Sequence, residues 1–124
     1  MIDIKSLRLG NIVQFYDWYK DGMYKQFRII SIDQDSEYLS LSDGTIRTCI
    51  SFNELEPVPL TKELLLKYGF KKDASGSFHV KNIEIYFSNN ESFGVIDNIP
   101  IKGLKYLHQL QNIYYYLENK ELEV

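Results

Sequence analysis

Residues 56–70 read EPVPLTKELLLKYGF and separate a strand-rich half of the chain from a half with helical signals. Pro57 and Pro59 each lack a backbone donor and disfavour helix in the preceding residue, so the stretch starts extended. Thr61 offers a hydroxyl that can cap a helix, and Gly69 can take the left-handed conformation that ends one. The stretch therefore predicts an extended junction that leads directly into a short helix.

The first half alternates short β-prone runs with turn signals. The runs lie at 12–15, 27–32, 38–41 and 46–50, and Gly, Asn, Asp and Ser lie between them. Short strands at this spacing predict an antiparallel meander that curls into a small SH3-like β-barrel. The long arm between the first two runs predicts a protruding loop or ribbon that turns at Asp21 and Gly22.

The second half continues from the helix into alternating strands and ends in another helix. Alternating apolar residues at 77–80, 83–87 and 93–96 predict antiparallel strands, and residues 98–102 are expected to be a connector. A second helix is predicted from apolar residues at three- and four-residue steps: Leu104, Leu107, Leu110, Tyr114 and Leu117.

These patterns predict an α+β fold with a strand-rich small barrel at 1–57 and a helix, antiparallel strands and a C-terminal helix at 58–124. Val58 and Leu60 alternate with the two prolines, so their side chains are expected to be buried. A junction this short and apolar is unlike a free linker. We therefore expect the two halves to pack as one rigid unit.

The composition and charge limit the classes of partner. Hydrophobic residues make up 44% of the chain and charged residues 25%, which is ordinary for a globular protein. Residues 1–57 carry six basic against nine acidic residues, and residues 58–124 carry eight of each. Neither half has the basic excess that binding to a phosphate backbone requires, which disfavours nucleic acid. No run is long and apolar enough to suggest a membrane partner.

Residue types that carry catalysis or bind metals are sparse. Cys49 is the single cysteine and lies in an apolar run, so it is expected to be a buried small hydrophobe. His79 and His108 lie on different predicted elements, with no carboxylate or cysteine at ligand spacing. We therefore expect no enzymatic activity, no metal site and no cofactor.

The first candidate contact surface is aromatic and lies on the arm of the first half. Its members are Tyr16, Trp18, Tyr19 and Tyr24. They could cover the barrel, anchor a protein partner, or stack on single-stranded nucleic acid beside nearby lysines. Asp17 and Asp21 oppose phosphate, so a protein is favoured over nucleic acid as the partner.

The second candidate contact surface lies on the predicted last helix, at Tyr106, Gln109 and Tyr116. One side of this helix must be buried against the strands. The opposite side is expected to carry uncharged polar groups, including His108 and Gln111, where a solvated face would usually carry more Lys and Glu. The extra aromatic residues could broaden the buried side or meet another chain.

Three segments support a resemblance to a known group of proteins. They are LRLGN at 7–11, residues 59–70, and YLHQLQN at 106–112, the most specific of the three. On these segments the chain resembles a group of small uncharacterised proteins of Bacteroidetes-type gut bacteria, their mobile elements and their phages, including crAss-like phages. The resemblance spans nearly the whole chain in the same order. It implies a phage or prophage context and transfers no functional residue.

The resemblance and the residues together predict a non-enzymatic structural or interaction protein. Its expected role is that of an auxiliary capsid- or virion-associated protein of a phage, with a capsid or other virion protein as partner. Its expected location is the cytoplasm, or the virion if a phage encodes it. The alternative is a small-barrel regulatory module that binds nucleic acid or a host protein.

Overall fold

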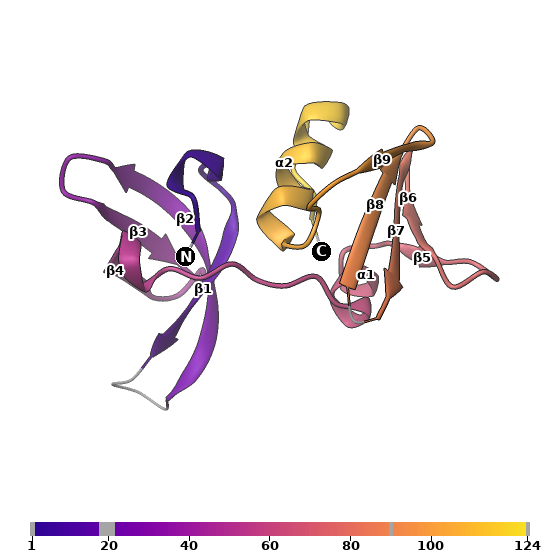
Figure 1. Cartoon of the computed structure of the whole chain (residues 1–124). Helices are drawn as coiled ribbons and strands as arrows, with labels where there is room; N and C mark the ends of the chain where they lie inside the picture. The colour runs from indigo at the N-terminus through magenta and orange to yellow at the C-terminus, as the bar shows by residue number, and fades with distance from the viewer. Residues whose placement is uncertain (1, 18–21, 90, 124) are drawn as a thin grey trace. The chain divides into compact units, whose positions relative to one another are not determined.

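A computed structural model describes residues 2–17, 22–89 and 91–123, which form two antiparallel sheets and two α-helices (Figure 1). The predicted α+β class is therefore confirmed. The chain divides into two compact units, unit 1 at Met1–Val58 and unit 2 at Pro59–Val124. Val58 and Leu60, on the two sides of this boundary, are both buried as predicted.

Unit 1 is a four-stranded meander with two short 3₁₀ helices. In chain order its elements are η1 (Ile4–Ser6), β1 (Ile12–Asp17), β2 (Met23–Asp33), β3 (Tyr38–Ser42), β4 (Arg47–Ser51) and η2 (Phe52–Glu54). Each strand pairs with the next in antiparallel register, with an irregularity between Ile29 and Ser31.

The described strands of unit 1 form the predicted antiparallel meander, but this sheet is open and does not close into a barrel. After η2, the chain pairs with the free edge of β1 through a single bridge between Gln14 and Glu56. Pro57 and Pro59 follow immediately and cannot donate backbone hydrogen bonds to a longer ladder. The same prolines that marked the junction therefore explain why the pairing stops.

The core of unit 1 follows from the alternation of its strands. Its buried members are Ile2, Val13, Phe15, Phe27, Ile29, Leu39, Leu41, Ile50 and Leu55. The rings of Phe15 and Phe27 stack with centroids 5.2 Å apart. Ile50 points into this cluster, so its neighbour Cys49 points out and is exposed. The predicted burial of Cys49 is therefore wrong.

The LRLGN segment is a turn that joins the start of β1 to β2. The Asn11 side chain is fully buried, and its Oδ1 accepts a hydrogen bond of 2.7 Å from the Arg8 backbone. The Gly10 amide donates to the Ile29 carbonyl at 2.8 Å, and the Ile29 amide donates to the Asn11 carbonyl at 2.9 Å. Gly10 adopts a φ of 94°, which favours glycine.

Unit 2 contains a five-stranded meander and both α-helices. In chain order its elements are α1 (Lys62–Lys67), β5 (Lys71–Lys72), β6 (Phe78–Val80), β7 (Ile83–Ser88), β8 (Glu91–Ile96), β9 (Ile99–Ile101) and α2 (Leu107–Glu118). The strands pair in sequence order. α2 lies on one side of this sheet (Figure 1).

The ends of α1 are capped as the sequence predicts. Thr61 Oγ1 accepts a hydrogen bond of 3.1 Å from the Leu64 amide. At the other end Gly69 has a φ of 86°, and the Phe70 amide donates to the Leu65 carbonyl at 3.0 Å. These bonds satisfy backbone groups that a helix this short would otherwise leave to water.

Strand β9 occupies part of the segment that was expected to be a connector. Asp97 and Asn98 both have positive φ, 50° and 67°, and form the tight turn that folds β9 back on β8. Pro100 pairs opposite Val95 in this strand at the sheet edge, where a missing donor is tolerated. The expected connector is thus wrong because this turn uses Asp and Asn in place of glycine.

One face of the β5–β9 sheet is buried. The helices and the residues just before them cover it. Phe78, Ile83 and Ile85 lie on this face and are almost fully buried, as are Leu65, Leu107 and Leu110 of the helices. Gly94 lies in the same row, and a Cβ on it would come within 2.3 Å of Leu104 Cδ2. The absence of a side chain at this position therefore lets the chain before α2 approach the sheet.

The buried side of α2 is wider than the leucine stripe predicts. His108 is 3% exposed and Gln111 is fully buried, whereas both were expected on the open side of the helix. Tyr114 is buried but Leu117 is exposed. The sequence pattern misplaced these polar side chains because it counted apolar residues only, whereas His108 and Gln111 directly follow Leu107 and Leu110 and flank their stripe.

Candidate functional site

The first candidate surface forms a two-stranded ribbon at the end of unit 1. Tyr16 pairs with Tyr24, and Asp17 pairs with Met23, in the continuous antiparallel register of β1 and β2. We call residues 14–17 and 23–26 the aromatic ribbon. It projects below the rest of unit 1 in Figure 1. Trp18 and Tyr19, from the same predicted surface, lie outside the described residues.

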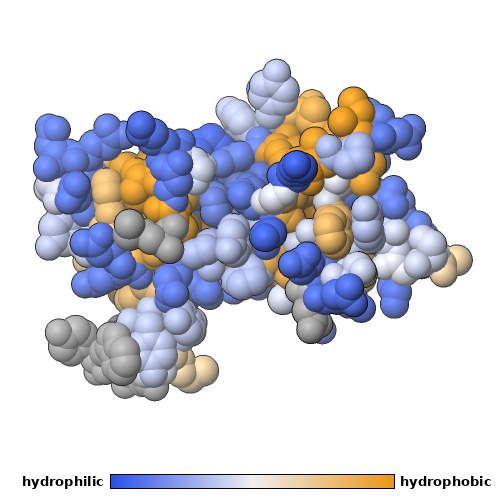
Figure 2. Space-filling view, viewed as in Figure 1, coloured by the Kyte–Doolittle hydropathy of each residue, from blue (hydrophilic) through white to orange (hydrophobic). Residues whose placement is uncertain are grey.

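The aromatic ribbon carries apolar side chains on both of its faces. Tyr16 and Tyr24 share one face, and Met23 lies on the other, because successive residues of a strand alternate. Met23 is 62% exposed and Tyr24 is 53% exposed. In Figure 2 the projecting arm is pale, of intermediate hydropathy, where much of the neighbouring surface is strongly hydrophilic. The ribbon thus exposes large side chains that a partner could contact, on a backbone held by strand pairing.

Tyr16, Tyr24 and Glu56 meet in what we call the aromatic corner. The two rings lie 5.3 Å apart between centroids and are inclined by 72°, an edge-to-face arrangement. The Tyr24 hydroxyl donates a hydrogen bond to the Glu56 carboxylate, and this contact raises the pKa of Tyr24 above its ordinary value. A carboxylate is therefore held beside two aromatic rings.

The backbone of Glu56 is fixed to β1 on the opposite edge from β2. The Gln14 amide donates to the Glu56 carbonyl at 3.0 Å, and the Glu56 amide donates to the Gln14 carbonyl at 2.8 Å. Gln14 also donates from Nε2 to the Pro57 carbonyl at 3.0 Å. Glu56 was missed in the sequence because it reaches the ribbon only through this long-range bridge.

The second candidate surface does not form one contact patch. The Gln109 side chain accepts hydrogen bonds from the Lys105 and Tyr106 amides at 2.9 and 3.1 Å and so caps α2. Tyr106 is half-buried and stacks on His108 with ring centroids 6.1 Å apart. Tyr116 alone of the three predicted residues is strongly exposed, at 87%. Most of the YLHQLQN motif is therefore used to build unit 2.

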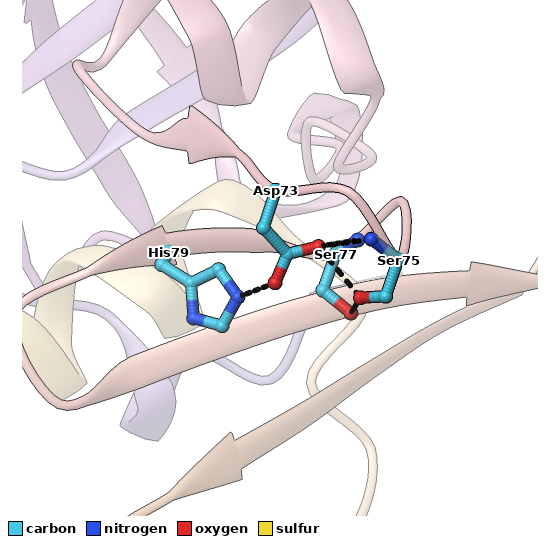
Figure 3. Close-up of polar contacts among 4 residues, drawn as sticks. All are labelled: Asp73, Ser75, Ser77 and His79. Atoms are coloured by element: carbon cyan, nitrogen blue, oxygen red, sulfur yellow. Dashed lines mark hydrogen bonds and ion pairs between the residues drawn. The ribbon is translucent and has the colours of Figure 1, made fainter.

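A polar cluster in the β5–β6 hairpin was not predicted (Figure 3). Asp73 Oδ1 accepts hydrogen bonds from the Ser75 and Ser77 amides at 2.9 and 3.1 Å, and from Ser75 Oγ at 2.6 Å. Asp73 Oδ2 pairs with His79 Nε2. These hydrogen bonds, that of Ser75 first, lower the pKa of Asp73 to about 2.

His79 thus has a carboxylate neighbour in the structure, although the sequence predicted none. Lys71 of β5 pairs opposite His79 of β6, which brings the loop residue Asp73 beside the imidazole. Sequence spacing alone did not reveal this contact because it depends on the register of the hairpin.

The chemistry of the hairpin cluster is structural. A serine nucleophile needs a base that hydrogen-bonds its hydroxyl and removes the proton. Here Ser75 Oγ donates to Asp73, and the imidazole nitrogen that would act as base faces the same carboxylate. The cluster therefore fixes the turn between β5 and β6 through side-chain to backbone bonds.

The described part of the chain offers few other sites. Within residues 2–17, 22–89 and 91–123, no group of three His, Cys, Asp or Glu side chains is placed to hold a metal ion. No described helix is long and apolar enough to cross a membrane. No family model, curated protein or solved structure matches the chain. The aromatic ribbon remains the feature that best fits a functional contact.

Proposed function

We propose that this chain is a non-enzymatic interaction protein that binds a protein partner through the aromatic ribbon, and that the partner is a capsid or other virion protein of a phage. The observation that carries the proposal is the exposure of Met23 and Tyr24 outside the hydrophobic cluster of unit 1. Tyrosine and methionine are enriched where protein surfaces meet. The phage context comes from the resemblance of the LRLGN and YLHQLQN segments.

The backbone of the ribbon supports this role. Tyr16 and Tyr24 are held by strand pairing, and their rings pack on each other. Binding through side chains that are already ordered loses less conformational entropy than binding through a loose loop. The ribbon can therefore serve as a preorganised anchor for a partner.

Mass spectrometry of purified phage particles tests the virion role. Particles would be collected from cells in which the phage or prophage that carries the gene is induced, and washed at high salt. We expect the chain in the particle fraction at a constant ratio to the capsid protein. Recovery only in the particle-free lysate would contradict a virion-associated role.

The alternative is a small-barrel regulatory module that binds nucleic acid or a host protein. What supports the alternative is the four-stranded antiparallel meander of β1 to β4, the part of the chain from which a small barrel was expected. The Glu56 carboxylate in the aromatic corner opposes phosphate. Filter binding over a range of salt concentrations tests it, since affinity for nucleic acid must fall with salt.

A further inference from the structure

The aromatic corner has the chemistry that attracts a cation. The face of a tyrosine ring carries negative charge density and binds an ammonium or guanidinium group placed over it. Tyr24 keeps half of its surface exposed, and Glu56 pairs with Gln14, which lies on the same face of β1 as Tyr16. The Glu56 carboxylate on this face adds a direct attraction for positive charge.

The corner also lies on a paired backbone, formed by two strands and the single bridge of Glu56. Tyr16 and Tyr24 lie opposite each other on β1 and β2, and Glu56 is joined to β1 by two backbone hydrogen bonds through Gln14. None of the three groups needs a backbone rearrangement to present its charge or ring face. A cation would therefore meet a ready arrangement.

The charge of unit 1 favours the same ligand. Residues 1–57 carry six basic and nine acidic residues, while residues 58–124 are balanced at eight of each, so the net charge of −3 belongs to the first half. Arg28 lies on the same face of the sheet as Tyr24, and its guanidinium donates to the Gly10 carbonyl at 3.0 Å. This arginine is thus engaged opposite Ile12, the first residue of β1, four residues along β2 from Tyr24.

We propose that the aromatic corner of Tyr16, Tyr24 and Glu56 binds an arginine side chain of the protein partner. This inference rests on the proposed function and names the chemistry that the partner presents. Arginine fits better than lysine because its planar guanidinium stacks on a ring while it donates to a carboxylate. A phosphate-bearing ligand is excluded at the same position by Glu56.

The test uses two capped pentapeptides with four glycines around a central residue, which is arginine in one and its neutral isostere citrulline in the other. Each is titrated into the full-length, isotope-labelled chain and followed by NMR. We expect the arginine peptide to shift the signals of Tyr16, Tyr24 and Glu56 and to bind about fivefold more tightly than the citrulline peptide. Equal affinities, or shifts elsewhere on the chain, would overturn the inference.

Three variants separate the contributions of Glu56 and Tyr24 to the preference for arginine. Glu56→Gln should remove most of the preference for arginine, and Tyr24→Leu should remove both the preference and the shifts. Tyr116→Ser changes an exposed tyrosine of α2 and should leave the preference intact. A Glu56→Gln variant that still prefers arginine fivefold would show that the carboxylate has no part in the recognition.

Failure of this inference can be told apart from failure of the proposed function. If ribbon variants lose the virion partner while arginine and citrulline peptides bind alike, the ribbon is an interface but the arginine site is wrong. If the peptides discriminate as expected and the chain never associates with particles, the arginine site stands and the virion role falls.

Discussion

Two polar side chains, His108 and Asp73, lie in surroundings that the sequence did not predict. His108 of α2 is 3% exposed, and Asp73 accepts three hydrogen bonds in an exposed turn. His108 was expected on the open side of the last helix, and the contacts of Asp73 were not predicted. Each gives a measurable pH dependence that follows from its surroundings.

The burial of His108 should make the stability of unit 2 fall in mild acid. Burial lowers the pKa of His108 below its usual 6.5, so the unfolded chain takes up this proton at a higher pH than the folded chain. The contribution of neutral His108 is complete above the unfolded-state pKa. It is lost as pH falls through the folded-state pKa, with a slope of at most about 1.4 kcal/mol per pH unit.

Urea unfolding at a series of pH values measures this effect in wild type and in His108→Gln. The variant keeps a neutral polar group and should show a flatter dependence of the free energy of unfolding between neutral and mildly acidic pH. Parallel curves for the two proteins would show that His108 does not titrate on unfolding.

The Asp73 turn should depend on its carboxylate. Asp73→Ala removes the acceptor of the Ser75 and Ser77 amides, so both amides should exchange with solvent faster. Ser75→Ala removes only the hydroxyl bond and should have the smaller effect. The pKa of Asp73 is lowered to about 2 from its usual 3.8. The Ser75 and Ser77 amides should therefore stay protected from exchange above pH 3.8 and lose that protection as the pH falls toward 2. Unchanged exchange in Asp73→Ala would contradict this role.

At the scale of elements, the contact between β8 and the chain before α2 depends on a missing side chain. A Cβ on Gly94 would lie 2.3 Å from Leu104 Cδ2 and 3.3 Å from Leu104 Cβ. Gly94→Ala should therefore destabilise unit 2 by about 1–3 kcal/mol through overpacking. Chemical denaturation would measure the loss.

The matched control for this prediction is the same change in a Leu104→Ala background. Leu104 is 2% exposed, so its truncation has a cost of its own. In this background Gly94→Ala should lower the free energy of unfolding by less, because the Leu104 methyl that would clash with the new Cβ is absent. Equal costs in both backgrounds would show that the clash with Leu104 is not the cause.

Elements whose signals are local in the sequence were predicted well. The ends of α1 follow from Thr61 and Gly69, since a cap involves only the adjacent turn. Strand β9 was missed because Asp97 and Asn98 make a tight turn without glycine. The open sheet of unit 1 was predicted as a barrel because strand spacing does not reveal where pairing ends.

The candidate site shows the same division between local and long-range information. The aromatic residues of the ribbon, Tyr16 and Tyr24, were visible as a cluster in the sequence, and pairing of β1 with β2 brings them together. The part played by Glu56 and the contact of Asp73 with His79 could not be predicted. Both depend on how two segments pair, and the sequence alone does not give that register.

At the scale of the whole molecule, the rigid association of the two units stays a prediction from the apolar junction. Leu60 is 7% exposed, and its amide donates to the Lys105 carbonyl at 2.9 Å within unit 2. Leu60→Asp places an uncompensated charge there and should cost several kcal/mol. If the junction couples the units, calorimetry of the wild type shows one transition, and this variant unfolds both. Two separate transitions in the wild type would contradict the coupling.

The central claim is that the aromatic ribbon binds a virion protein, and its most direct test is the copy number of ribbon variants in phage particles. A double variant, Met23→Ser with Tyr24→Ser, alters exposed ribbon side chains, and Tyr116→Ser alters an exposed side chain of α2. Quantitative mass spectrometry of purified particles should find wild type and Tyr116→Ser at equal copy number and the folded ribbon variant at least tenfold depleted. Equal incorporation of the ribbon variant, or loss of Tyr116→Ser alone, would contradict the claim.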